Sequence, residues 1–163
     1  MHRSFWTRWL LAVLTFCLAI GTFSSPAWAD VDPYITRYLK VTAPISLEFD
    51  SQGQTRLFSP EELSMGKQLF ENSCLNCHVG GATLPDPTVS LSLSDLQHAT
   101  PKRDNISSLV AFFRQPMTYD GSEESSWCRQ VPETWLSQAQ VESLAGFVLR
   151  AAQTAPGWGF KDF

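Results

Sequence analysis

Residues 74–78 form the stretch of this sequence with the clearest chemistry. They read Cys74-Leu75-Asn76-Cys77-His78, a C-x-x-C-H pattern. Two thiols at this spacing match the two vinyl groups of haem, to which they add covalently, and the histidine that follows them is the proximal iron ligand of such sites. The pattern therefore predicts one covalently attached haem c per chain, held by Cys74 and Cys77, with His78 on the iron.

Two other kinds of site also use paired cysteines. A thioredoxin-like site needs a βαβ surround, which the pattern of apolar residues does not indicate. A zinc site needs a second pair of ligands, and only His98 and Cys128 remain downstream, far apart in the sequence. Haem attachment is therefore the favoured interpretation.

The first 29 residues have the pattern of a secretory signal peptide. Arg3 and Arg8 precede an apolar run over residues 9–20, and Ala27-Trp28-Ala29 offers a cleavage site before Asp30. An uncleaved anchor is the less favoured alternative, because the run is short for a helix that spans a bilayer. The mature chain is therefore expected to be exported and to lack a transmembrane segment.

Cleavage would change both the net charge and the cysteine count. It would leave 134 of the 163 residues and remove two basic side chains, so the mature chain would carry a net charge of −6. Such a charge argues against nucleic acid and anionic membrane surfaces and favours polar or basic partners. Cleavage would also remove Cys17, so Cys128 would remain as an odd cysteine in an exported protein, which needs an explanation. At this length we expect one domain, monomeric when free.

Apolar periodicity predicts a small helical domain that follows a β-hairpin. Ile45, Leu47 and Phe49 alternate with polar residues, and a turn at residues 50–53 leads to a returning strand. The chain then divides into three expected parts: an N-terminal arm and hairpin over residues 30–58, a cytochrome domain over residues 59–155 and a tail over residues 156–163.

The helices of this domain have clear start signals. Ser59 and Pro60 begin a helix expected to run to about Asn72, and further helices are expected over residues 94–99, from Asp104 or Asn105 to Pro116, and over residues 138–152. Gly66, Phe70 and Cys74 share one face of the first helix, because they recur every four residues. The small Ala145 and Gly146 are expected to receive Gly66 in a close helix crossing.

Several motifs together resemble a known family. The chain contains a G-x-x-x-F-x-x-x-C-x-x-C-H helix, and its other motifs are Cys77–Gly81, Ala99-Thr100-Pro101 with Arg103-Asp104-Asn105, and Thr118–Gly121. This combination resembles the class I cytochromes c and, within them, the cytochrome c-550 family, the extrinsic haem subunits of photosystem II. The resemblance covers roughly Val41 to Arg150 and is nearest to the divergent c-550-like paralogues of cyanobacteria.

The resemblance implies an all-α, class I cytochrome c-like fold and a low-potential haem in the thylakoid lumen, with the periplasm as second choice. It implies electron transfer associated with photosystem II, through a redox partner that the sequence does not identify, and not an enzyme. Two alternatives are open. One is a structural extrinsic subunit that stabilises the oxygen-evolving complex, and the other is a redox- or gas-responsive haem from which Cys128 dissociates on reduction.

The chain departs from the family at the distal iron ligand. Family members use a second histidine shortly after Tyr-Asp-Gly, but no histidine follows His98 here, and Cys128 lies within one residue of that place. We therefore predict that Cys128 is the distal ligand, bound as a thiolate that ferric iron and Arg129 favour. Met117 and His98 are the rival ligands, and a free Cys128 thiol is a further alternative.

Overall fold

A computed structural model of the chain describes residues 30–84 and 88–160, with three isolated positions nearer the start, Trp6, Trp9 and Val13. The predicted signal peptide falls outside this described part except at those three positions. Helices dominate the described fold, which confirms the all-α class. Its elements are α2 (Pro33–Arg37), β1 (Ile45–Glu48), β2 (Thr55–Phe58), α3 (Pro60–Ser73), the 3₁₀ turn η1 (Val79–Gly81), α4 (Leu93–His98), α5 (Ile106–Arg114) and α6 (Gln138–Thr154).

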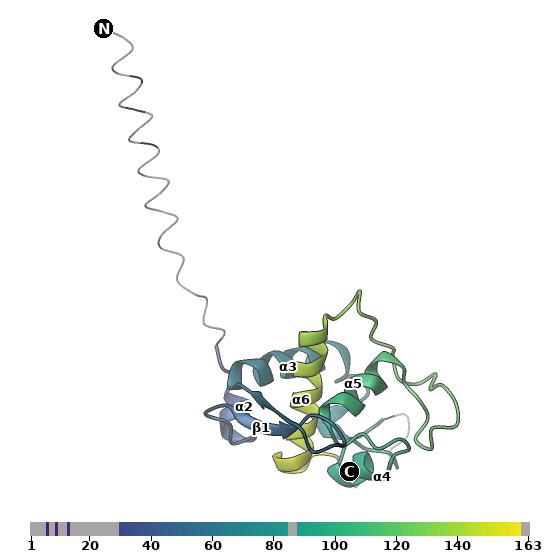
Figure 1. The fold of residues 1–163 in the computed structure, drawn as a ribbon. Helices are drawn as coiled ribbons and strands as arrows, with labels where there is room; N and C mark the ends of the chain where they lie inside the picture. Colours follow the sequence, from purple (N-terminus) through teal and green to yellow (C-terminus); the bar gives the residue numbers. More distant parts are fainter. Residues whose placement is uncertain (1–5, 7–8, 10–12, 14–29, 85–87, 161–163) are drawn as a thin grey trace.

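Helices α3 and α6 cross at the centre of the molecule (Figure 1). A Cβ added at Gly66 would strike the carbonyl of Ser143 and lie 2.9 Å from Cβ of Phe147, so only glycine permits this approach. The predicted close crossing is confirmed, but the predicted receiving residues, Ala145 and Gly146, are wrong. Ser143 and Phe147 are one helical turn apart and both meet Gly66, whereas Gly146 faces Phe58 of β2 and Leu63 of α3.

The predicted hairpin is present and closes the N-terminal side of the core. Strands β1 and β2 pair antiparallel, with Ile45 opposite Phe58. Leu47 and Phe58 are buried, which is the alternation expected of a strand with one face on a core. Asp50 Oδ1 accepts hydrogen bonds from the amides of Gln52 and Gln54 and so stabilises the turn.

Helix boundaries follow local capping chemistry. Three helices begin with reciprocal capping boxes, formed by Ser59 with Glu62, Asn105 with Ser108, and Ser137 with Gln140. In each box the first side chain accepts from the backbone of the third helical residue, whose own side chain accepts from the capping amide. The predicted starts of α3, α5 and α6 are therefore confirmed.

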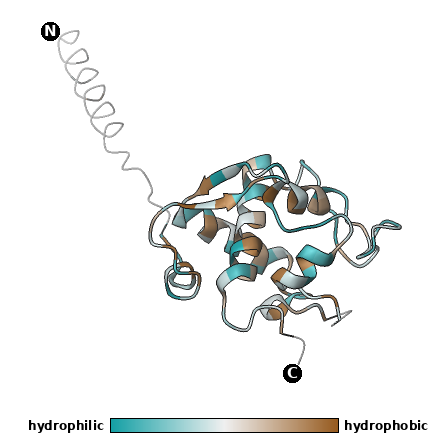
Figure 2. Ribbon diagram, turned by 60° about the horizontal axis from the view of Figure 1, so that its bottom comes forward, coloured by the Kyte–Doolittle hydropathy of each residue, from teal (hydrophilic) through white to brown (hydrophobic). Residues whose placement is uncertain are grey.

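The long connection between α5 and α6 leaves the body of the molecule as a loop (Figure 1). Polar residues dominate this loop, whereas apolar residues concentrate on the helices (Figure 2). Among the described residues, none of the helices has both the length and the apolar character needed to cross a bilayer.

Candidate haem site

The C-x-x-C-H motif forms a single turn at the C-terminal end of α3. Cys74 caps the helix, and its amide donates to the carbonyl of Phe70 at 2.8 Å. The amides of Cys77 and His78 then both donate to the carbonyl of Cys74, at 3.1 and 3.0 Å. This tight turn holds two thiols and one imidazole together at the helix end.

The chain turns sharply after the motif, and two glycines allow it. Gly80 and Gly81 have φ values of 57° and 80°, in the left-handed region that favours glycine. A side chain at Gly81 would also lie 2.6 Å from the indole of Trp158. The amide of Leu84 returns to donate to the carbonyl of Cys77 at 2.8 Å, which ties the loop to the motif.

The imidazole of His78 is oriented by its neighbours. Its Nδ1 lies 3.1 Å from Oγ1 of Thr83. Burial lowers the pKa of His78, although the backbone of Ala82 opposes this by hydrogen bonding. With Nδ1 engaged by Thr83, Nε2 of this half-buried imidazole is the nitrogen that would bind iron.

Cys128 lies within electrostatic range of the motif, although it is distant in sequence. Cys74, Cys77 and Cys128 are all free thiols. Burial, together with the smaller effects of the neighbouring Cys128 and Cys77 thiols, raises the pKa of Cys74 to about 12. Burial also raises the pKa of Cys128, while the charge of Arg103 opposes the rise. The structure therefore brings the predicted distal cysteine to the two predicted haem cysteines.

The segment that carries Cys128 is held to the end of α5 on either side of the cysteine. Before it, the amide of Ser125 donates to the carbonyl of Pro116 at 2.9 Å, and Oγ of Ser125 accepts from the amide of Cys128 at 3.4 Å. After it, the amide of Val131 donates to the carbonyl of Phe113 at 2.8 Å. A loop anchored at both ends presents a ligand in a defined place.

The Tyr-Asp-Gly turn within this segment is also rigid. Asp120 Oδ1 accepts hydrogen bonds from Oγ1 of Thr118 at 2.7 Å and Oγ of Ser122 at 2.8 Å. These bonds lower the pKa of Asp120 to about 2. Gly121 has no room for a side chain, because a Cβ there would strike the carbonyl of Thr100. Two of the motifs that carry the family resemblance therefore touch each other.

The rival ligands occupy different surroundings. His98 is exposed at the end of α4, and its Nδ1 lies 2.7 Å from the carbonyl of Ser94 in its own helix. Met117 is half-buried at the start of the loop between α5 and α6, where its backbone pairs with Glu124 in an isolated bridge. The sequence did not exclude either residue as a distal iron ligand.

The cation assigned to Cys128 from the sequence was the wrong one. Arg129 is exposed, and its guanidinium stacks over the ring of Trp135 at 4.6 Å. The positive charge that acts on Cys128 belongs instead to Arg103, which is buried. Adjacency in the sequence misled because a side chain in an irregular loop can point in any direction.

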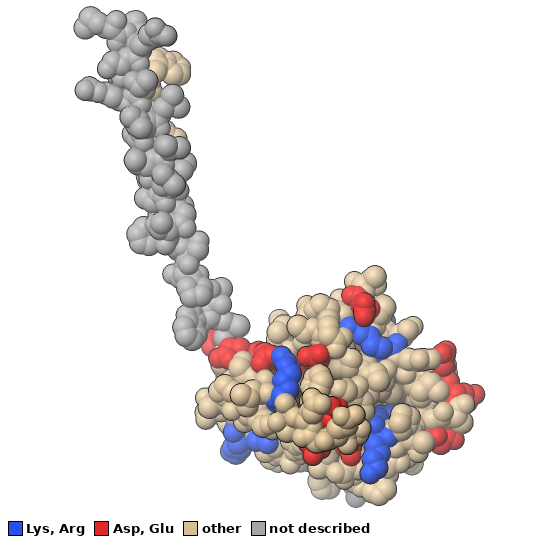
Figure 3. All heavy atoms as spheres, in the orientation of Figure 1, with Lys and Arg blue, Asp and Glu red and all other residues tan. Residues whose placement is uncertain are grey.

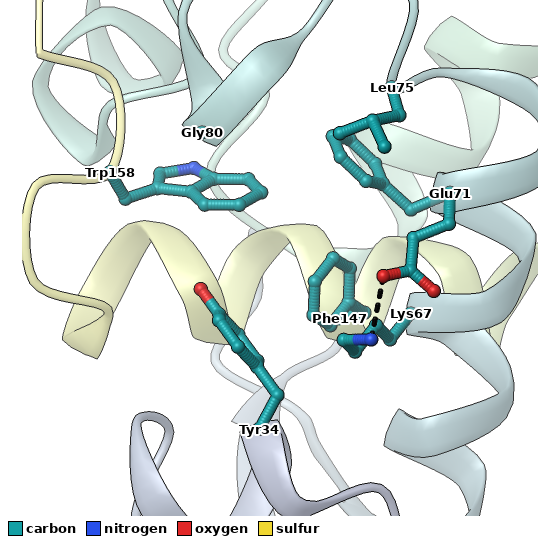
Figure 4. A pocket seen from close by; sticks show the side chains of 8 residues that line it. Tyr34, Lys67, Glu71, Leu75, Gly80, Phe147 and Trp158 are labelled. Carbon is teal, nitrogen blue, oxygen red and sulfur yellow. Dashed lines mark hydrogen bonds and ion pairs between the residues drawn. The ribbon is translucent and has the colours of Figure 1, made fainter.

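A separate cavity of about 290 Å³ lies between α2, α3, α6 and the tail (Figure 4). Its lining comprises Tyr34, Lys67, Phe70, Glu71, Leu75, Gly80, Phe147 and Trp158. Neither the motif cysteines nor Cys128 line it. Leu75 and Gly80 do, so this cavity borders the haem-binding turn without containing its donors.

The donor set fits a covalently bound haem. Among the described residues, no group of three or more His, Cys, Asp or Glu side chains could hold a metal ion by itself. The helix α3 ends in two free thiols and a half-buried histidine and crosses a C-terminal helix at a glycine. This arrangement defines a c-type cytochrome.

Comparison with known proteins gives the particular family. The cytochrome c-550 domain matches residues 38–163. A cytochrome c-550-like protein of Thermosynechococcus vestitus is 53% identical over 98% of this chain and 94% of its own length. The photosystem II extrinsic protein V of Gloeobacter violaceus is 52% identical over 78% of this chain and 69% of its own length. The chain belongs to the cytochrome c-550 family.

Solved structures agree with this assignment. The PsbV2 cytochrome from Thermosynechococcus elongatus superposes with a TM-score of 0.80 and 58% identity, over 80% of this chain and all of that one. Cytochrome c549 superposes with a TM-score of 0.61 and 32% identity, over 66% of this chain and 90% of that one. The predicted class I cytochrome c-like fold is confirmed, and the chain carries covalently bound haem c.

Proposed function

We propose that this protein is a low-potential electron carrier of the thylakoid lumen that works in association with photosystem II. Its haem c, when bound, supplies a one-electron ferric–ferrous couple. The observation that carries the proposal is the tight turn that groups Cys74, Cys77 and His78 at the end of α3, with Cys128 in electrostatic range of Cys74. We propose that Cys74 and Cys77 hold the porphyrin by thioether bonds and that Nε2 of His78 is the proximal donor.

Cys128 is the proposed distal donor, as a thiolate. The thiol is partly buried, lies in range of the haem-binding turn and is held by an anchored loop. An anionic axial donor stabilises the ferric state over the ferrous state, so the potential is expected to be low. Met117 and His98 are the ligands to be tested against Cys128.

The test of this ligand is the Cys128→Ala variant of the holoprotein. We expect loss of the low-spin thiolate signal in the ferric electron paramagnetic resonance spectrum and a rise in the reduction potential. Met117→Leu and His98→Gln serve as matched controls and should leave both unchanged. An unaltered ferric spectrum in Cys128→Ala would exclude the cysteine ligand.

A structural role in photosystem II is the second candidate function. It is favoured by the 52% identity to a relative named photosystem II extrinsic protein V. Photosystem II cores stripped of extrinsic subunits provide the test. Binding of the holoprotein with restored oxygen evolution, retained when Cys128→Ala has altered the potential, would indicate the structural role. Reversible redox cycling without such binding would indicate a free carrier.

Carbon monoxide separates an inert carrier from a gas-responsive haem. If Cys128 leaves the iron on reduction, the ferrous protein should bind carbon monoxide rapidly, whereas a retained ligand would slow binding. Cys128→Ala lacks the proposed distal ligand, so its rate of carbon monoxide binding gives the rate expected when no ligand has to leave the iron.

A further inference from the structure

The cavity beside the haem-binding turn has aromatic walls. Phe70 and Phe147 form its inner wall and are buried. Tyr34 and Trp158 are half-buried, and their ring centroids lie 6.2 and 5.8 Å from that of Phe147. Figure 4 shows Tyr34 and Trp158 on different sides of the open space. With a volume of about 290 Å³ the cavity can hold one small organic molecule between these rings.

Tyr34 brings a polar group to these walls. Its hydroxyl points across the cavity toward the indole of Trp158 (Figure 4). Within the part of the chain that the structure describes, this hydroxyl has no hydrogen-bond partner. A phenol hydroxyl both donates and accepts, so it can orient one polar group of an occupant.

Charged side chains at the edge of the cavity carry a net negative charge. Nζ of Lys67 bonds to a carboxylate oxygen of Asp32 at 2.8 Å and to one of Glu71 at 2.7 Å. One cation between two carboxylates leaves a net charge of −1. Lys67 and Glu71 line the cavity, and the side chain of Glu71 is 44% exposed. This charge favours a cationic occupant over an anionic one.

The acceptors decide which kind of cation fits. A primary ammonium group has three N–H donors that need partners when water is removed. The carboxylates of Asp32 and Glu71 are already engaged by Lys67, and the hydroxyl of Tyr34 is one acceptor only. A quaternary ammonium group has no N–H donor, and aromatic rings attract its charge.

We propose that this cavity binds a small quaternary ammonium compound. The methyl groups of such a compound fill the apolar space between Tyr34 and Trp158, and its charge meets the aromatic rings and the carboxylate of Glu71. The site is separate from the haem-binding cysteines and from Cys128, so the proposal is independent of the identity of the distal iron ligand.

Choline is the probe for this site, and dimethylbutanol is its neutral analogue, in which carbon replaces the ammonium nitrogen. Each compound is titrated into the holoprotein and followed by calorimetry and by the NMR signal of the Trp158 indole. We expect choline to shift this signal and to bind about tenfold more tightly than dimethylbutanol. Equal affinities, or a Trp158 signal that choline leaves unmoved, would overturn the proposal.

Two pairs of variants test the charge and the aromatic wall. Glu71→Gln should weaken choline binding about threefold, whereas Glu133→Gln, which removes an exposed carboxylate that does not line the cavity, should not. Tyr34→Leu should weaken binding at least tenfold, whereas Tyr34→Phe keeps the ring and most of the affinity. Equal affinities within either pair would contradict the proposed recognition.

Haem absorbance separates loss of the site from loss of the fold, because a folded variant keeps its bound haem. If Tyr34→Leu does not fold, the comparison of Glu71→Gln with Glu133→Gln decides, since both side chains are solvent-accessible. Cys128→Ala should bind choline as tightly as the unsubstituted protein does, because Cys128 does not line the cavity. Loss of binding in this variant would place choline at the haem site and overturn the proposal.

Discussion

Thr83 hydrogen-bonds to the imidazole of His78, which we propose as the proximal ligand. Its Oγ1 lies 3.1 Å from Nδ1 of His78. When Nε2 binds iron, Nδ1 carries the proton and donates to Thr83. Such a bond raises the basicity of the ligand and favours ferric iron.

Replacing Thr83 by valine is therefore expected to raise the reduction potential slightly. The shift should be small, because the backbone of Ala82 also hydrogen-bonds to the ring. Potentiometric titration of the holoprotein measures it, and Thr83→Ser, which keeps the hydroxyl, is the control. A fall in potential for Thr83→Val would contradict this role.

At the scale of single elements, the crossing of α3 and α6 depends on one glycine. Alanine in a helix interior normally stabilises by about 1 kcal/mol relative to glycine. At Gly66 the added methyl group would meet the carbonyl of Ser143 and Cβ of Phe147. We therefore expect Gly66→Ala to lower the free energy of unfolding of the ferric holoprotein by about 1–3 kcal/mol.

Denaturant unfolding followed by haem absorbance measures this loss. Gln68→Ala is the control, because Gln68 is exposed on the same helix and such surface changes usually fall within about 0.5 kcal/mol of neutral. Equal stability of Gly66→Ala and the unsubstituted protein would show that the helices separate without cost.

The helices could be predicted because their start signals lie in neighbouring residues. Parts of the site could not be predicted, because they depend on contacts between residues that are distant in the sequence. Ser59 with Pro60 predicted the start of α3, because capping needs only neighbouring residues. Cys128 was selected by the cysteine count and by its register after Tyr-Asp-Gly. The sequence gives no sign that Arg103 acts on Cys128, because this relation depends on how the loop between α5 and α6 folds back. Thr83 carried no sequence signal at all.

The tail shows the same limit at the scale of the whole molecule. Its described part, residues 156–160, lies outside the helices and strands, but Trp158 docks it against the core. Nε1 of Trp158 donates to the carbonyl of Leu91 at 2.9 Å, and its ring packs against Phe70 and Phe147. Two flanking glycines were the only local hint. The C-terminal segment thus buttresses the loop that follows the haem-binding turn.

Substitutions at Trp158 separate packing from hydrogen bonding. Trp158→Phe keeps a ring and loses the bond to Leu91, so we expect a loss of about 0.5–1.5 kcal/mol. Trp158→Ala should cost more, up to about 3 kcal/mol, because it removes the ring from the aromatic cluster. Thermal unfolding of the holoprotein measures both. Equal losses for the two variants would mean that the ring contributes nothing.

Charge is unevenly distributed over the visible face of the molecule. Acidic side chains gather at the edge formed by the loop between α5 and α6 (Figure 3), where Asp120, Glu123 and Glu124 are exposed. Most of the remaining face is uncharged. This edge belongs to the loop that carries Cys128, so a basic partner attracted to it would arrive near this proposed distal ligand.

The N-terminal segment is attached to the body by a second group of charges. Lys67 Nζ pairs with Asp32 at 2.8 Å and with Glu71 at 2.7 Å. Asp32 also caps α2 by accepting from the amide of Tyr34 at 2.7 Å. Burial alone would raise the pKa of Asp32, but the bonds from Lys67 and Tyr34 outweigh it, and the pKa is lowered.

Because the pKa of Asp32 is lowered in the folded protein, the stability that Asp32 contributes decreases as the pH falls. The contribution of Asp32 is fully present above its unfolded pKa, near 3.8, and is lost as the pH falls through the lower folded value. Asp32→Asn keeps the cap and loses the ion pair, so it should cost at most about 1 kcal/mol at neutral pH and nothing in acid. Asp32→Ala should cost about 1 kcal/mol more, because the cap is lost as well. Unfolding measured from pH 7 to pH 2 checks both, and a cost for Asp32→Asn that persists at pH 2 would contradict the ion-pair assignment.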